Sequence, residues 1–190
     1  MILVLTATGD AFYVFAKGCV LEAMSDLQSV GVKRAASSSD VQQLVEHLML
    51  IELSKALGRT LTKATIPVGR SKISVDGFHR EPHRVILAEA WAHVGKAKAA
   101  QVNKVRSDML KMVLIKGLLK RSYPDLKVEC YLAFADSIAA AVITTGRSWT
   151  SIAAAEFGIE ARVVALTEEV IAKIKETQQR QDIRIADETG

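Results

Sequence analysis

The chain has 190 residues, of which 49% are hydrophobic and 24% are charged, and its formal net charge is +4. This length supports one well-packed core, so we expect a single domain over residues 1–190, and the hydrophobic content excludes a disordered chain. The two cysteines, Cys19 and Cys130, form neither a disulfide framework nor a zinc site.

The N-terminal half predicts an edge strand, two helices and a three-stranded meander. Residues 1–6 are apolar enough for an edge strand, and residues 10–29 place their apolar side chains at helical spacing. A second helix begins at Ser39, where Gln42 completes a capping-box pattern, and it ends at Gly58. The predicted strands that follow cover 59–68, 72–76 and 84–92.

The C-terminal half alternates helices with strands. A long basic helix runs from about 96 to 120, and it is followed by a strand at 126–135, a helix at 137–144, a helix ending at 157, a strand at 160–166 and a helix to about 181. A meander followed by a helical crossover indicates an α/β fold, with a central mixed β-sheet flanked by helices on both faces.

Two carboxylates lie in neighbouring strands of the meander. Asp76 ends the second strand, and Glu89 directly follows the apolar run 85–88 of the third. A buried carboxylate is costly unless it is paired or binds a cation, so these two residues could share one divalent metal ion. The alternative for Asp76 is a turn residue, because Asp-Gly is a common turn pair.

The helix that ends at Gly58 carries two further glutamates. At about 100° per residue, Glu52 falls inside the apolar stripe of that helix, whereas Glu46 falls on its more polar side. A glutamate on a buried face either has a partner or serves a site, so Glu52 is a candidate for a functional role.

Positive charge is concentrated in the segment 96–127, which holds nine basic residues and two acidic ones. A basic patch on a mildly acidic body indicates a polyanionic partner, although a solvated helix face would also explain it. One stripe of the basic helix is polar, because helical spacing places four of its side chains within about 80° of one another. These side chains are Gln101, Lys104, Asp108 and Lys111, and an ion-paired surface stripe is the alternative.

The order of elements, together with Asp76 and Glu89 thirteen positions apart, resembles the PD-(D/E)XK nuclease superfamily, whose fold is restriction-endonuclease-like. The resemblance implies a core over about 40–135, with Asp76 and Glu89 holding Mg²⁺ or Mn²⁺. It also implies a supporting glutamate from the preceding helix, for which Glu46 and Glu52 both stay candidates. Nucleic-acid contacts are expected from Lys96, Lys98, Gln101, Lys104 and Lys111.

The sequence departs from the family motif at one position. The family's catalytic lysine is replaced by Trp91, which cannot position or activate an attacking water. Lys72 is the best candidate for that role, because it lies four residues before Asp76 on the same face of one strand, and an exposed strand lysine with no catalytic role is the alternative. Lys98 and Lys111 of the basic helix are weaker candidates for the same role.

The resemblance implies a divalent-metal-dependent nuclease that hydrolyses phosphodiester bonds, with DNA favoured over RNA. Two alternatives remain: a catalytically inactive nuclease-like protein that binds nucleic acid or acts in assembly, which Trp91 favours, and a small interaction domain with no nucleic-acid role. The apolar helix at 10–29 could mediate a homodimer. No apolar run resembles a membrane span or a secretory leader, so we expect a cytoplasmic protein with no membrane partner.

Overall fold

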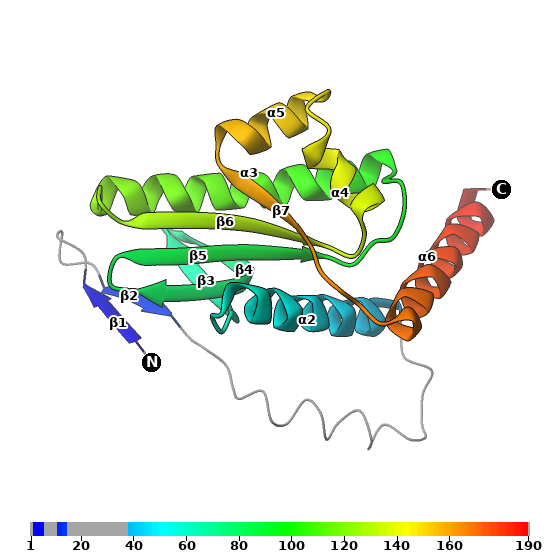
Figure 1. The fold of residues 1–190 in the computed structure, drawn as a ribbon, viewed down its shortest axis with the longest axis horizontal. Helices are drawn as coiled ribbons and strands as arrows, with labels where there is room; N and C mark the ends of the chain where they lie inside the picture. The colour runs from blue at the N-terminus through cyan, green and yellow to red at the C-terminus, as the bar shows by residue number, and fades with distance from the viewer. Residues whose placement is uncertain (1, 6–10, 15–37, 190) are drawn as a thin grey trace, which may run out of the picture.

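A five-stranded mixed β-sheet forms the centre of the molecule in the computed structural model, which describes residues 2–5, 11–14 and 38–189 (Figure 1). The strands lie side by side in chain order, and they are β3 (Thr62–Val68), β4 (Ser71–Glu81), β5 (Arg84–Trp91), β6 (Lys127–Phe134) and β7 (Ile159–Val163). The first three strands pair antiparallel, whereas β5, β6 and β7 pair parallel. This arrangement confirms the predicted α/β class and the mixed sheet.

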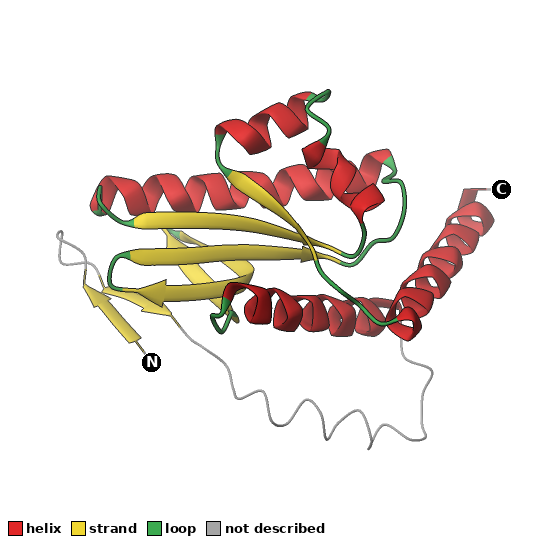
Figure 2. Ribbon diagram, in the orientation of Figure 1, coloured by secondary structure: helices red, strands yellow, loops and turns green. Residues whose placement is uncertain are grey.

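Helices cover both faces of the sheet (Figure 2). The described helices are α2 (Ser38–Leu57), α3 (Ala99–Ser122), α4 (Ser137–Thr144), α5 (Trp149–Glu156) and α6 (Glu168–Thr189). Leu87 of β5 packs in one core with Met112 of α3, and the next residue back, Ile86, packs in the other core with Met49 of α2. Successive residues of a strand point to opposite faces, so β5 must be apolar on both sides.

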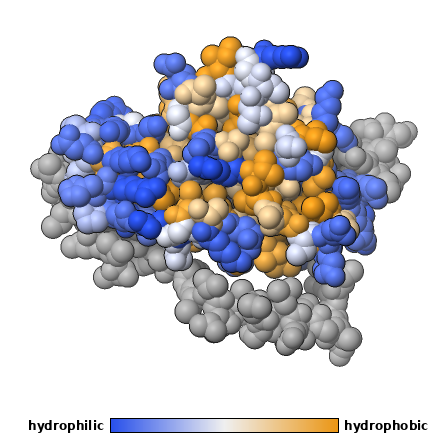
Figure 3. All heavy atoms as spheres, viewed as in Figure 1, coloured by the Kyte–Doolittle hydropathy of each residue, from blue (hydrophilic) through white to orange (hydrophobic). Residues whose placement is uncertain are grey.

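Part of the surface is apolar. Several large apolar side chains stay exposed around α5 and the adjoining face of α3, among them Trp149, Ile152 and Leu110, and Figure 3 shows hydrophobic side chains around α5.

Within the described part of the chain, no helix combines the length and the apolar character that crossing a membrane requires.

The N-terminal prediction is confirmed for the strand over 1–6 and wrong for the start of the helix over 10–29. Ile2–Leu5 form strand β1, but Ala11–Val14 form strand β2, which pairs antiparallel with β1 in a separate two-stranded sheet. The segment 11–14 contains two aromatic residues and a valine, which favour a strand, and short apolar runs are ambiguous by periodicity alone. Residues 15–29, Cys19 included, lie outside the described residues.

Strand β4 pairs with β5 over only its second half. It pairs with β3 from Ser71 to Val75 and again at Phe78, whereas its ladder with β5 covers only Gly77 to Glu81. Between Val75 and Phe78, three steps on β4 oppose two on β3, so β4 carries a bulge in its ladder with β3. Asp76 lies in this bulge, one residue before the ladder with β5 begins.

Gly77 lies at the bulge and is packed tightly from three sides. A Cβ atom added there would lie 3.0 Å from Ala88 Cβ, 3.1 Å from Leu50 Cδ2 and 3.4 Å from Leu61 Cβ. The absence of a side chain therefore lets α2 approach the sheet next to Asp76.

We predict that Gly77→Ala lowers the free energy of unfolding by about 1–3 kcal/mol, because the methyl group overpacks the contact between α2 and β5. Urea denaturation of the two proteins measures the difference. Gly117→Ala is the matched control, since a Cβ at Gly117 in α3 meets no atom within 4 Å. The control should stabilise the protein by about 0.5–1 kcal/mol, and equal effects of the two substitutions would contradict the packing argument.

Candidate functional site

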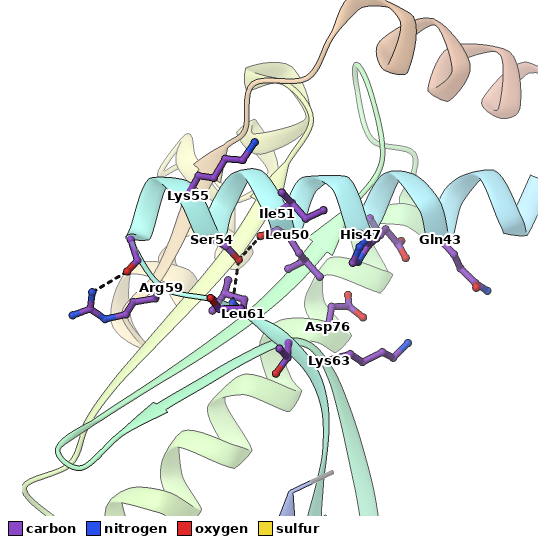
Figure 4. A pocket seen from close by; sticks show the side chains of 14 residues that line it. Gln43, His47, Leu50, Ile51, Ser54, Lys55, Arg59, Leu61, Lys63 and Asp76 are labelled. Atoms are coloured by element: carbon purple, nitrogen blue, oxygen red, sulfur yellow. Dashed lines mark hydrogen bonds between the residues drawn. The ribbon is translucent and has the colours of Figure 1, made fainter. Parts of the chain in front are cut away.

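Asp76 and Glu89 come together where β4 and β5 separate. The Asp76 Oδ2 atom accepts a hydrogen bond of 3.2 Å from the backbone N–H of Ala90, which lies beyond the end of the β4–β5 ladder. The Asp76 side chain thus takes the place of a backbone partner for β5. Figure 4 shows Asp76 beneath α2 and beside Lys63 of β3.

Glu89 is almost fully enclosed, with 2% of the residue exposed. It points to the α3 side of the sheet, the same side as Leu87 and Trp91 of its own strand. The Lys111 ammonium group lies 2.7 Å from Glu89 Oε1, although the angle between the two groups falls short of a well-directed hydrogen bond. A cation, here the ammonium group, already lies beside this buried oxygen.

The surroundings of Glu89 favour its protonated form. The pKa of Glu89 is raised from 4.5 to about 8: burial is the largest cause, hydrogen bonding to Asp76 and the charge of Asp76 act in the same direction, and Lys111 opposes them. In the absence of a cation, Glu89 is therefore mostly protonated at neutral pH. A divalent cation between them would favour the charged form of both groups.

Lys111 reaches Glu89 from α3. Burial opposes its charge, but its bonds to Glu89 and Asp108 outweigh burial, and the pKa of Lys111 is raised above its usual value. The buried Asp108 carboxylate holds Lys111 at 2.9 Å on one oxygen and Lys104 at 3.1 Å on the other. The polar stripe predicted on this helix is thus a chain of charges that ends at Glu89.

Of the two glutamates kept open by the sequence, Glu46 is the one that lies near this cluster. Burial raises the pKa of Glu46, the Gln42 side chain and Lys104 lower it, and the charges of Asp76 and Asp108 raise it. Glu52, by contrast, forms a surface ion pair of 2.6 Å with Lys55 one turn further along α2. The apolar stripe misplaced Glu52 because its side chain leaves the helix toward solvent rather than toward the sheet.

Lys72 is not brought to the cluster. It is exposed beside the hairpin turn and pairs across the ladder with Pro67, four residues and roughly 13 Å along the strand from Asp76. Lys72 was chosen because it shares a strand face with Asp76, and that choice ignored the distance between the two residues along the strand. Lys111 was the weaker candidate for the lysine role, although its spacing from Asp108 on one helical face was a signal in its favour.

The other residues proposed for nucleic-acid contact lie near the start of α3. Lys96, Lys98 and Lys104 are exposed. Gln101 turns inward, where its amide lies 3.2 Å from His93 Nδ1 and its Oε1 accepts a 2.7 Å hydrogen bond from the Lys98 N–H. Gln101 therefore supports the start of the helix.

Trp91 is a core residue. It stands where the family that the sequence resembles has its lysine. Its ring stacks on His93 at 4.9 Å and meets Phe134 edge-on at 5.7 Å. With 4% of the residue exposed, it offers no surface to a base. Trp91 therefore serves to pack the core on the α3 side of the sheet.

Metal ligands can be judged from the same geometry. Across the described ranges, no three His, Cys, Asp or Glu side chains form a ready cage for a metal ion. Mg²⁺ does not require one, because it usually takes one or two carboxylates and completes its shell with water and phosphate oxygens. Asp76 and Glu89 fit that pattern, because they are two carboxyl groups that lie close enough to affect the pKa of Glu89.

Comparison with known proteins gives little beyond a distant structural likeness. No protein-family model matches the chain, and no curated protein matches its sequence. The fold is similar to the crystal structure of an XisH family protein from Nostoc punctiforme, with 13% sequence identity and a TM-score of 0.44, over 63% of this chain and 89% of that one. A likeness this distant concerns the backbone alone and says nothing about the site.

We predict that the metal-free protein loses stability as pH rises from about 4.5 to about 8, because folded Glu89 keeps a proton that the unfolded chain releases. The slope from this one group is at most about 1.4 kcal/mol per pH unit. Glu89→Gln, which is neutral throughout, should remove it. Urea denaturation in EDTA across this window measures the slope. The surface substitution Glu52→Gln is the control, and an unchanged slope in Glu89→Gln would contradict the prediction.

Proposed function

We propose that this protein is a divalent-metal-dependent nuclease that hydrolyses phosphodiester bonds of nucleic acid, with DNA as the expected substrate. One observation carries the proposal: Asp76, Glu89 and Lys111 converge where two strands separate, although they come from two strands and a helix. Two acids and a lysine are the groups needed to hold a divalent cation beside a scissile phosphate and to stabilise its charge.

Asp76 and Glu89 are the proposed ligands of Mg²⁺ or Mn²⁺. When bound, the ion would polarise the scissile phosphate and lower the pKa of an attacking water. The chain contributes the two carboxylates, one buried and one partly exposed, so that substrate reaches the site from the Asp76 side. Glu46 adds a third carboxylate from α2, close enough for Asp76 to influence its pKa.

Lys111 would take the part that a lysine on the strand has in the family that the sequence resembles. Asp108 fixes the Lys111 ammonium beside Glu89, so its position does not depend on the flexible side chain alone. An ammonium held there would orient the attacking water and offset negative charge that develops on the phosphate. Lys104, on the outer side of Asp108, is exposed and would bind a neighbouring backbone phosphate.

The second candidate is a nuclease-like protein that binds nucleic acid without cleaving it. The buried Trp91 favours it, since the strand itself supplies no lysine. The two candidates differ in one measurement, because a binding module without a metal site should hold nucleic acid equally well with Mg²⁺ and with EDTA and should never cut it.

Cleavage of labelled DNA with Mg²⁺ or Mn²⁺ tests the proposal. Asp76→Asn, Glu89→Gln and Lys111→Met should each lower the initial rate by at least about 100-fold, because each removes charge that acts on the transition state. Lys120→Met, at the far end of the same helix, should leave the rate within about twofold. Full activity in Glu89→Gln would refute the proposed site.

We also predict a steep salt dependence of DNA binding that the start of α3 controls. Each phosphate contact contributes about 0.9 to the slope of log K against log salt, so Lys96→Gln and Lys98→Gln should each reduce that slope by about one. Fluorescence anisotropy at several salt concentrations measures it. Lys120→Gln removes the same charge from the other end of α3, and a similar reduction in that variant would mean that the contacts are not confined to the site.

A further inference from the structure

A cleft of about 620 Å³ lies between the C-terminal half of α2 and strand β3, and it opens directly onto the proposed site (Figure 4). Asp76 and Glu46 both line it. The buried residues Leu50 and Leu61 form an apolar floor, and the exposed residues at its rim are polar, including Gln43, His47 and Lys63. A ligand in this cleft would touch the site at the Asp76 end.

The size of the cleft limits what can enter. Its volume falls within the range of about 300–1,000 Å³ that is typical of clefts for small molecules. The major groove of duplex DNA is by itself about 12 Å wide, so a paired duplex can lie across the mouth of the cleft but cannot enter it. An unpaired base with its sugar is of the right size, and the apolar floor suits the face of a base.

The charges of the cleft favour a phosphate at one end. Lys55 is paired with Glu52, and Arg59 is paired with Glu81, so both cations at the far end are committed. Lys63 is exposed, and no acid of the described chain forms an ion pair with it. Lys63 therefore offers a cation beside Asp76, and His47 offers a flat ring on which a base can stack.

We infer that this cleft binds an unpaired nucleotide next to the scissile phosphate, which makes single-stranded DNA, or a single-stranded end of a duplex, the preferred substrate. The inference rests on the proposed function for the position of the scissile phosphate, because Asp76 belongs to both. The base lies over Leu50 and Leu61, its phosphate faces Lys63, and the strand continues to the acids.

Binding in EDTA tests this inference without cleavage. Fluorescence anisotropy is measured with a labelled single-stranded oligonucleotide and with the blunt duplex of the same sequence. The single strand should bind at least about tenfold more tightly. Lys63→Glu should weaken single-strand binding about tenfold and lower its salt slope, and His47→Ala should weaken it severalfold.

Arg70→Glu is the matched control, since it makes the same two-unit change of charge in the turn of the same hairpin, outside the cleft. Its single-strand affinity should stay within about twofold of the wild type. Equal binding of duplex and single strand, or equal losses in Lys63→Glu and Arg70→Glu, would overturn the inference. Circular dichroism verifies that each variant is folded before its affinity is compared.

The two proposals fail in different ways. Selective single-strand binding that depends on Lys63, with no cleavage in Mg²⁺ or Mn²⁺, would support the cleft and refute the nuclease. Metal-dependent cleavage of blunt duplex that is lost in Glu89→Gln but unchanged in Lys63→Glu would support the nuclease and refute the cleft.

Discussion

The burial of the Glu89 carboxylate is the constraint on which the site depends. An ionisable group that is 2% exposed in the middle of an apolar strand is costly, and the chain offsets that cost from two directions. Asp76 approaches through the opening beside β4, and Lys111 approaches from the helix above. Replacing one partner of such a buried group with an apolar residue would leave the others without compensation, so Asp76, Glu89 and Lys111 depend on one another.

The local backbone explains how the two acids meet. The ladder between β4 and β5 ends at Gly77 and Ala88, and beyond it the Asp76 side chain accepts a hydrogen bond from the Ala90 N–H of β5. The bulge in the ladder between β3 and β4 lies at the same point. Gly77 then allows α2 to pack against the sheet at the same point, which brings Glu46 near Asp76. The bulge in β4, the packing of α2 against Gly77 and the proximity of the carboxyl groups therefore all occur at the same point of the sheet.

Much of the fold could be predicted from the sequence because its signals are local. The helix over 137–144 begins after Asp136, whose side chain accepts a hydrogen bond from the Ala139 N–H, and the parallel strands are apolar on both faces. The N-terminal segment was mispredicted because its short apolar runs carry no clear period. The candidate acids were found because a charge within an apolar strand is visible without any structure.

The remaining parts of the site depend on tertiary distances that periodicity does not contain. Helical phase placed Glu52 in the apolar stripe, but the contact of α2 with Gly77 selects Glu46. Strand parity selected Lys72, yet it could not show that this residue lies exposed beside the hairpin turn, four residues along the strand from Asp76. The cleft at Lys63 and His47 was missed altogether, because neither residue breaks a local pattern in the sequence.

The positions of Trp91 and Lys111 are physically linked. Both lie on the α3 side of the sheet, and the Trp91 ring fills the space beside Glu89 by packing on His93 and Phe134. A lysine at that position would have to replace this aromatic packing with a buried ammonium, which burial disfavours. Lys111 instead enters from a helix whose outer side reaches solvent, and Asp108 and Glu89 supply its two acidic partners. With its cation on the helix at Lys111, the chain keeps the Trp91 packing under α3 and still has a positive charge beside Glu89.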